Sequence, residues 1–348
     1  MANENAIYLR SHVMGHAYGA PKAIPPQKAF GEAFAQHKSA LGEAAADQKF
    51  GEGAVVAILD TGYTAHRWFQ ESRRVPSPAE ADCDRWDLSS DSLPTYYAHG
   101  TFVAGRVLQY APRATIDLRR VTAMDGMSHD WVLAAAIMNL IPKDVPGEYG
   151  PDVLNLSLGP GEHGGDNKRE ATPQTTNAIR ALQQACGTVV VVSAGYTDDG
   201  WPQANLGAQG NVVEDLTIIV GASDDDHKVQ DFSAEIVDIF APGKEVKSTF
   251  IYWYGMTTAE PSGGTCDDCI RRLPPGPVEA QEYLGWASWS GTSFAAPAVA
   301  GAVASAVSRR TGTADIGARR RAARKDVVDD ATEKDGRRFL NARPIPLS

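Results

Sequence analysis

The residue of this chain best placed to act as a nucleophile is Ser293, within the stretch SGTSFAAPAVAG over residues 290–301. Gly291 permits a tight turn, and the small apolar residues that follow, with Pro297 among them, predict the start of a helix. A serine at a helix N-terminus lies in the positive field of the helix, beside free backbone N–H groups that suit an oxyanion. Most serines in such places are only helix caps, so chemistry at Ser293 requires partner groups from elsewhere in the chain.

Two candidate partner residues, Asp60 and His99, precede Ser293 in the sequence, and each lies in a different kind of predicted element. Asp60 ends the apolar run GAVVAILD, which predicts a strand buried on both faces of a parallel sheet. His99 opens the run HGTFVAG, whose small residues allow a helix to pack closely. A serine hydroxyl is a poor nucleophile near neutral pH, so an imidazole must take its proton and a carboxylate must hold that imidazole. A carboxylate that ends a strand is usually a turn or cap residue and a single histidine is usually structural, so the residue types alone do not select a catalytic set.

The segments that carry these residues also resemble those of a known family. The runs DTG, HGTFVAG and SGTSFAAP follow one another in the order found in the subtilisin-like serine peptidases. The resemblance covers residues 53–310 and, more weakly, the chain to about residue 342. It implies that Ser293 is the nucleophile, that His99 is the general base and then the general acid, and that Asp60 orients His99.

The elements that must position these residues alternate between strands and helices from residue 53 to about residue 221. Beyond the strand that ends at Asp60, buried strands are predicted at residues 152–159, 188–193 and 216–221, and helices at residues 128–140 and 175–186. Such alternation predicts right-handed βαβ units and a parallel sheet. With the resemblance, it predicts an α/β fold of three layers, in which a central, mostly parallel sheet is flanked by helices.

A peptide-binding cleft follows from the same resemblance. Ser157, Leu158 and Gly159 match the family's strand edge, which pairs with an extended peptide through main-chain hydrogen bonds. One wall of the primary specificity pocket is matched by Ser193, Ala194 and Gly195. The alternative is that both segments are merely strand ends with small residues.

Tyr196 departs from the family pattern, because an asparagine that donates to the oxyanion usually follows this Ser-Ala-Gly segment. The Tyr196 hydroxyl could donate instead, since a phenol is a competent donor. Alternatively, the backbone N–H of Ser293 acts alone, or Asn205 or another group takes the role. The carboxylates Asp198 and Asp199 could favour a basic residue before the cut, or they could form an exposed turn.

Three segments lie outside the strands and helices described above: an N-terminal extension, an insertion and a basic C-terminal helix. Residues 1–50 read as an N-terminal extension, with helical stretches at 28–35 and 40–48, that packs on the domain; a short pro-segment covering the active site is the alternative. Residues 51–348 form the catalytic domain, with an insertion at about 250–286 that could act as a lid. A basic helix face follows near the C-terminus and is expected to be solvated; it contains Arg319, Arg320, Arg321, Arg324 and Lys325.

The pattern of cysteines and carboxylates in the sequence does not predict a metal site. Cys266 and Cys269 have the spacing of zinc ligands, but a structural zinc needs four ligands and no second pair stands nearby. A local disulfide or two free thiols are the alternatives. No cofactor is expected. Calcium is common in the family, yet residues 61–69 hold no carboxylate at the place of one familiar site.

The composition of the chain limits the kinds of partner and the cellular location that can be expected. The chain has 348 residues, of which 43% are hydrophobic, and a net charge of −10, which argues against nucleic-acid binding. There is no apolar stretch long enough to cross a membrane, and the polar first residues lead us to expect no signal peptide. With four cysteines in all, the expected location is the cytoplasm, or the outside of the cell if the true N-terminus is missing.

These observations together predict a serine endopeptidase that hydrolyses peptide bonds through an acyl-enzyme. Its expected partner is a peptide or protein substrate, and a specialised processing role is expected. Two alternatives remain: a peptide ligase or macrocyclase of the same fold, in which an amine replaces water, and a catalytically weak binding homologue.

Overall fold

A computed structural model describes two short N-terminal segments and most of the chain beyond residue 50. The described residues are 11–13, 17–23, 50–64, 66, 69, 96–123, 126–143, 149–160, 173–196, 212–253, 283–310 and 315–342. Several predicted features lie outside them: the helices at 28–35 and 40–48, Asp198, Asp199, Asn205, Cys266 and Cys269.

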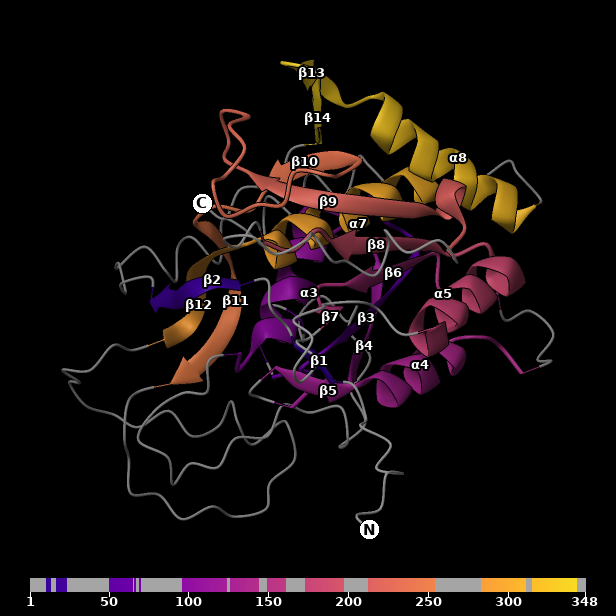
Figure 1. Cartoon of the computed structure of the whole chain (residues 1–348), viewed down its shortest axis with the longest axis horizontal. Helices are drawn as coiled ribbons and strands as arrows, with labels where there is room; N and C mark the ends of the chain where they lie inside the picture. Colours follow the sequence, from indigo (N-terminus) through magenta and orange to yellow (C-terminus); the bar gives the residue numbers. More distant parts are fainter. Residues whose placement is uncertain are drawn as a thin grey trace, which may run out of the picture.

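Eight strands of the described residues form one central sheet, in the order β13-β14-β10-β9-β8-β6-β3-β4 (Figure 1). All neighbours from β14 to β4 pair in parallel, and β13 pairs with β14 antiparallel. The strands are β3 (Val55–Asp60), β4 (Thr115–Arg120), β6 (Val153–Leu156), β8 (Val189–Ser193), β9 (Thr217–Ser223), β10 (Ile239–Pro242), β13 (Thr332–Lys334) and β14 (Arg337–Phe339). The prediction of a mostly parallel sheet is confirmed.

Successive residues of the central strands enter two different cores, because side chains alternate between the faces of a sheet. On β3, Val56 and Ile58 belong to one hydrophobic cluster, whereas Ala57 and Leu59 belong to the other. All four side chains are fully buried. The continuous apolar runs in the sequence are therefore strands covered on both faces, as predicted.

Helices cover both faces of the sheet and complete three layers (Figure 1). Phe102 of α3 (His99–Tyr110) and Val299 of α7 (Thr292–Arg309) lie in one cluster, together with Ala323 of α8 (Ile316–Asp329). Residues of α4 (Asp130–Met138) and α5 (Pro173–Cys186) lie in the cluster on the other face. A short 3₁₀ turn (Glu214–Leu216) leads into β9. The predicted three-layer α/β fold is confirmed.

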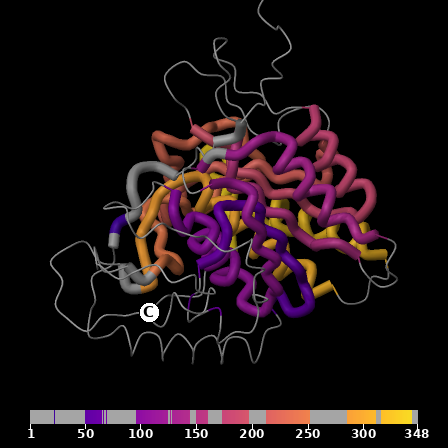
Figure 2. Tube along the Cα trace, turned by 90° about the horizontal axis from the view of Figure 1, so that it is seen from below, coloured from indigo at the N-terminus to yellow at the C-terminus, as the bar shows by residue number. Residues whose placement is uncertain are grey.

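Two smaller sheets include strands that the sequence did not predict. In one, β1 (Ser11–Val13) lies between β5 (Met127–His129) and β7 (Gly159–Pro160). In the other, β12 (Tyr283–Gly291) lies between β11 (Val246–Trp253) and β2 (Ala17–Ala23). Figure 2 shows the indigo segment of β2 beside the orange segment of β12. The paired strands β11 and β12 take in both ends of the predicted insertion, so residues 254–282 are what remains between them.

The expectation that the basic residues of α8 are all solvated is wrong, most clearly for Arg320. Arg320 has 2% of its surface exposed, and its guanidinium bonds the Asp152 carboxylate at 2.8 Å. It also donates to the carbonyls of Tyr149, Gly150 and Cys186. A buried charge needs such partners.

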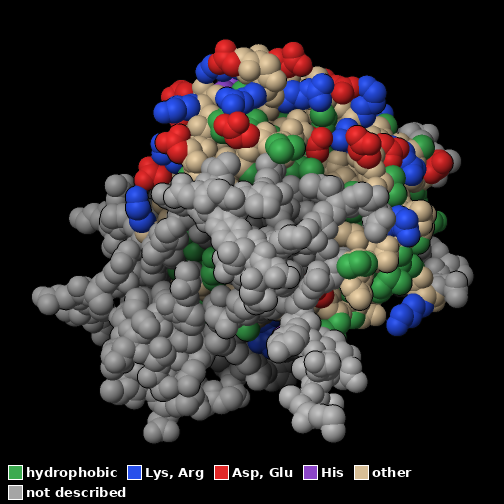
Figure 3. Space-filling view, in the orientation of Figure 1, with side chains coloured by type: hydrophobic (Ala, Val, Ile, Leu, Met, Phe, Trp, Pro, Cys, Tyr) green, Lys and Arg blue, Asp and Glu red, His purple; other side chains and the backbone are tan. Residues whose placement is uncertain are grey.

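Two of the other basic side chains of α8 are solvated as predicted, whereas Arg319 and Arg324 are half-buried. Arg321 and Lys325 are exposed and pair with the carboxylates of Asp215 and Asp329. On the face shown in Figure 3, basic and acidic side chains are interspersed over this part of the surface. That mixture is typical of a solvated face.

Candidate active site

Asp60 lies at the carboxyl end of β3 and is fully buried. Its Oδ1 accepts a hydrogen bond from the backbone N–H of Thr61 at 2.7 Å. The start of α3 comes close to this residue because Gly100 has no side chain: a Cβ there would lie 2.5 Å from the carbonyl oxygen of Gly62. The glycine after His99 thus explains why a helix can begin directly beside the carboxylate.

His99 is the first residue of α3 and is also fully buried. Its Nδ1 lies 2.9 Å from Asp60 Oδ1 and 3.0 Å from Asp60 Oδ2, so the proton on Nδ1 is directed at the carboxylate. The rings of Trp289 and Phe294 pack against the imidazole, with centroids 5.6 Å and 5.1 Å away. Within the described part of the chain, Nε2 has no hydrogen-bond partner. This nitrogen is therefore available to accept a proton.

Ser293 is the second residue of α7 and lies where the sequence predicted, at a helix N-terminus. The residue before the helix, Gly291, has φ 153°, a backbone conformation that favours glycine. The Ser293 hydroxyl donates to the carbonyl of Ser157 at 3.0 Å. In return, the Ser157 hydroxyl donates to the carbonyl of Ser293 at 2.8 Å. The hydroxyl of Ser293 thus has Ser157 as its acceptor here, while Asp60 and His99 contact each other directly.

The predicted strand edge lies directly beside Ser293. Ser157 and Leu158 are buried where β6 ends, and Gly159 begins β7. Asn155 is a member of this site that the sequence did not single out. Its side-chain amide donates to the Ser157 hydroxyl at 3.0 Å, and its Oδ1 has no hydrogen-bond partner among the described residues. In the sequence, the only indication that Asn155 belongs to the site is its position in the NLSLG segment, two residues before Ser157.

The second predicted segment also reaches the start of α7. Ser193, Ala194 and Gly195 are buried at the carboxyl end of β8. The backbone N–H of Gly195 donates to the Thr292 hydroxyl at 3.2 Å. This bond fixes the segment against the residue that precedes Ser293.

Tyr196 follows and is partly buried. Its backbone forms a bridge with Ser233, and its ring meets the ring of Phe232 edge-on at 6.2 Å. These contacts connect Tyr196 to the segment after β9. Its role toward an oxyanion stays a prediction.

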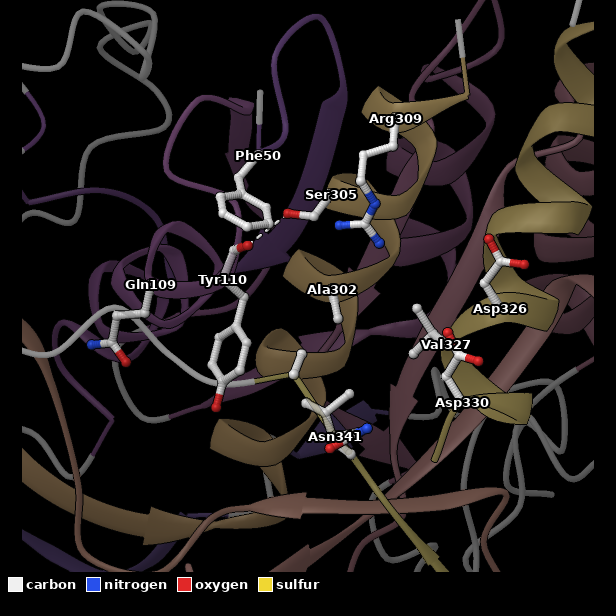
Figure 4. A pocket seen from close by; sticks show the side chains of 12 residues that line it. Phe50, Gln109, Tyr110, Ala302, Ser305, Arg309, Asp326, Val327, Asp330 and Asn341 are labelled. Atoms are coloured by element: carbon white, nitrogen blue, oxygen red, sulfur yellow. Dashed lines mark hydrogen bonds between the residues drawn. The ribbon is translucent and has the colours of Figure 1, made fainter. Parts of the chain in front are cut away.

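A cavity of about 410 Å³ lies away from these residues (Figure 4). Gln109 and Tyr110 line it from the C-terminal end of α3, and Ser305 and Arg309 from the C-terminal half of α7. His99 and Ser293 lie at the opposite ends of these helices, so this cavity does not coincide with the predicted peptide site.

Two properties of the described residues bear on possible partners. None of the described helices is both long and apolar enough to cross a membrane. Among the same residues, no group of three or more His, Cys, Asp or Glu side chains is arranged to hold a metal ion.

Comparison with solved structures supports the fold. One crystal structure, of a cold-adapted subtilisin-like serine proteinase, superposes with a TM-score of 0.53 at 20% identity and covers 84% of this chain and 90% of that one.

Comparison with known sequences supports the family. An intracellular serine protease of Paenibacillus polymyxa is 28% identical over 74% of this chain and 68% of its own length. The subtilisin-like serine protease Pen ch 13 of Penicillium rubens is 26% identical, and its match covers 74% of this chain but only 53% of its own length. The model of the subtilase family matches residues 51–341. The chain therefore belongs to the subtilase family of serine endopeptidases.

Proposed function

We propose that this chain is a processing endopeptidase in which Asp60, His99 and Ser293 form the catalytic triad. The observation that carries the proposal is the fully buried pair of Asp60 and His99, whose bonded Nδ1 leaves Nε2 as a proton acceptor. This is the tautomer that a general base requires, because the nitrogen opposite the carboxylate must carry the free lone pair.

The first step is the activation of Ser293. Its hydroxyl turns from the carbonyl of Ser157 to His99 Nε2, and Nε2 takes the proton as the oxygen attacks the peptide carbonyl carbon. Asp60 stabilises the imidazolium that forms. Two hydrogen bonds hold the backbone around Ser293 as its hydroxyl turns: the Ser157 hydroxyl donates to the Ser293 carbonyl, and the Gly195 N–H donates to the Thr292 hydroxyl.

The second step is collapse of the tetrahedral intermediate. Its negative oxygen faces the first N–H groups of α7, which have no partner within the helix. Tyr196 is the proposed side-chain donor to the same oxygen. His99 then gives its proton to the leaving amine, and water hydrolyses the acyl-enzyme by the reverse sequence of proton transfers.

A specialised role is supported by the burial of the site. The side chains of His99, Ser293 and Ser157 have no exposed surface, so substrate must gain access before it can be cut. Such a site suits a restricted set of substrates, such as an extended segment of a precursor peptide.

The test is active-site labelling followed by a digest of a peptide library read by mass spectrometry. A fluorophosphonate should label the active chain, and the label should be lost in Ser293→Ala. Cleavage at a narrow set of sequences supports the processing role. A labelled enzyme that cleaves most peptides would rule out that role, and products joined with loss of water would instead identify a ligase.

A further inference from the structure

Arg106 is a buried arginine on α3, the helix that begins with His99. It directly follows the run HGTFVAG and has 3% of its surface exposed. Seven residues make almost two turns of an α-helix, so Arg106 and His99 lie on the same side of α3. The hydrogen-bond partners of its guanidinium among the described residues are all uncharged. A buried cation without a carboxylate is costly, so a specific reason for its place is expected.

The guanidinium of Arg106 joins α3 to the first turn of α7. Its Nε donates to the carbonyl of Phe294, the residue directly after Ser293, at 3.3 Å. Its Nη2 donates to the carbonyl of Pro242, at the end of β10, at 3.2 Å. One side chain therefore ties the helix of the proposed base and the helix of the proposed nucleophile to the same strand of the central sheet.

Two neighbours on α3 fix the orientation of the guanidinium. Arg106 Nη1 donates to the side-chain oxygen of Gln109, and the Gln109 amide donates to the carbonyl of Lys247 on β11 at 2.8 Å. The Arg106 Cζ lies over the ring of Tyr110, 5.4 Å from the ring centroid, where a cation and an aromatic face attract each other. These contacts hold the planar guanidinium in the orientation that serves both backbone carbonyls.

Phe294 connects this network to both partners of the proposed proton transfer. Its ring packs against the imidazole of His99, with the centroids 5.1 Å apart, and its backbone continues that of Ser293. The carbonyl of Ser293 accepts from the Ser157 hydroxyl at 2.8 Å, and the carbonyl of Phe294 accepts from Arg106. The first turn of α7 is therefore held by two side chains that lie outside the helix.

We infer that Arg106 is a positioning residue, which holds the backbone of Phe294 so that the Ser293 hydroxyl can reach His99 Nε2. The inference rests on the proposed function, because it concerns the approach of the nucleophile to its base. Arg106 itself touches no substrate and transfers no proton. A misplacement of about 1 Å between reacting groups can cost about 10²-fold in rate, so even a small shift of this turn would lower turnover.

Ser305 offers a matched comparison, because it joins the same two helices far from the site. It is buried, and its hydroxyl donates to the carbonyl of Tyr110 at 2.6 Å (Figure 4). It lies about three turns along α7 from Ser293. Loss of this bond should weaken the packing of α3 on α7 without moving the first turn of α7.

The first experiment compares turnover and stability in Arg106→Met and Ser305→Ala. In Arg106→Met, kcat per folded molecule should fall about 10²-fold with little change in KM, because the substrate-binding edge is untouched. Its urea midpoint should change little, because an apolar side chain removes a buried charge together with its hydrogen bonds. Ser305→Ala should show the reverse, a lower urea midpoint with kcat unchanged. Unchanged kcat in Arg106→Met, or an equal fall in Ser305→Ala, would overturn the inference.

Arg106→Lys keeps the charge and tests the shape of the guanidinium. An ammonium group is a compact point charge and lacks the rigid fork that reaches two carbonyls at once. We expect a fluorophosphonate to label Ser293 about tenfold more slowly than in the wild type, at a rate between those of the wild type and Arg106→Met. This variant also carries the test if Arg106→Met does not fold. Labelling at the wild-type rate would contradict the positioning role.

A third measurement separates the nucleophile from the base. The NMR signal of the proton between His99 Nδ1 and Asp60 reports a pair that Arg106 does not contact, and it should be the same in the wild type and in Arg106→Met. A changed signal would mean that Arg106 acts on the base, against the inference.

The outcomes for the inference and for the proposed function are distinct. A wild type that is labelled and cuts peptides, with Arg106→Met and Arg106→Lys equally fast, would overturn the inference alone. A wild type that is neither labelled nor able to cut peptides would overturn the proposed function, and the positioning role with it.

Discussion

Ser157 and Ser293 exchange two hydrogen bonds, each hydroxyl donating to the carbonyl of the other residue. The pair joins the end of the substrate-binding edge to the start of the nucleophile helix. Because a substrate N–H would compete for the Ser157 carbonyl, binding of substrate should release the Ser293 hydroxyl toward His99. If Ser293 is the nucleophile, this contact should hold its hydroxyl away from His99 until a peptide occupies that position.

Ser157→Ala removes the bond to the Ser293 carbonyl while leaving the Ser157 carbonyl in place. We expect kcat/KM to fall about tenfold and the free energy of unfolding to fall by about 1 kcal/mol, the usual net value of one hydrogen bond. Ser305→Ala is a matched control, because Ser305 is also buried and donates to the carbonyl of Tyr110 at the far end of α3. Equal losses of kcat/KM in both variants would contradict a role at the nucleophile.

Asp60→Asn should leave the fold intact but allow the wrong tautomer of His99. Losing the carboxylate of a triad lowers kcat by about 10⁴-fold in other serine peptidases, and we expect a loss of that order here. The measurement is kcat on the best library peptide, with circular dichroism as the check on folding. A loss below tenfold would show that Asp60 does not orient the base.

Tyr196→Phe tests the proposed oxyanion donor. If the hydroxyl donates, its removal should lower kcat by roughly 10²-fold with little change in KM, the size seen for one such donor. The ring contact with Phe232 is kept in this variant, so packing is the same. Unchanged turnover in Tyr196→Phe, together with a faster Tyr196→Asn, would exclude the hydroxyl.

Arg320→Ala should be severely destabilising. It leaves the buried Asp152 carboxylate without its main partner, which costs about 3–5 kcal/mol. Arg321→Ala, on the same helix, breaks an exposed pair with Asp215 and should cost at most about 1 kcal/mol. Urea unfolding of the two variants measures the difference. Similar stabilities would mean that the buried pair contributes no more than the exposed one.

Asp224 should make stability depend on pH in the acid range. Burial raises its pKa, but hydrogen bonds from the backbone N–H groups of Lys228 and Asp226 and from Gln230 outweigh burial and leave the pKa below its usual value. A depressed carboxyl pKa stabilises the fold above the unfolded-state pKa, and this stabilisation is lost as pH falls through the folded-state pKa.

The comparison that tests Asp224 is the loss of stability between pH 5 and pH 3 in the wild type and in Asp224→Asn. We expect a smaller loss in the variant, because it has no carboxyl to protonate at this position. A loss as large as that of the wild type would assign the acid sensitivity to other groups.

The fold and the three proposed catalytic residues were predictable because their signals are local. Apolar runs such as the one before Asp60 specify strands covered on both faces, and the small residues after His99 specify a helix that packs closely. The strand pairings of the N-terminal segment were missed, because residues 11–23 carry no alternation of polar and apolar residues. Their partners, β7 and β12, lie far along the chain, and no local pattern reveals such a pairing.

The same limit explains the residues that were misread or not singled out. Arg320 was predicted to be solvated because it lies within a run of basic residues, whereas its carboxylate partner precedes it by more than half the domain. Asn155 lies in a buried strand. Its place in the site is evident only from the structure, in which its amide donates to the Ser157 hydroxyl and that hydroxyl donates to the Ser293 carbonyl. Contacts between distant segments have no signature in a single sequence.

The Asp152 carboxylate has a consequence for biosynthesis. One of its oxygens accepts from the backbone of Val55, at the start of the strand that ends in Asp60, and the other from Arg320 of α8. A nascent chain still lacking α8 has no cation for this carboxylate. Translation should therefore run through residue 320 before the strand that ends in Asp60 can settle against the segment that carries Asp152.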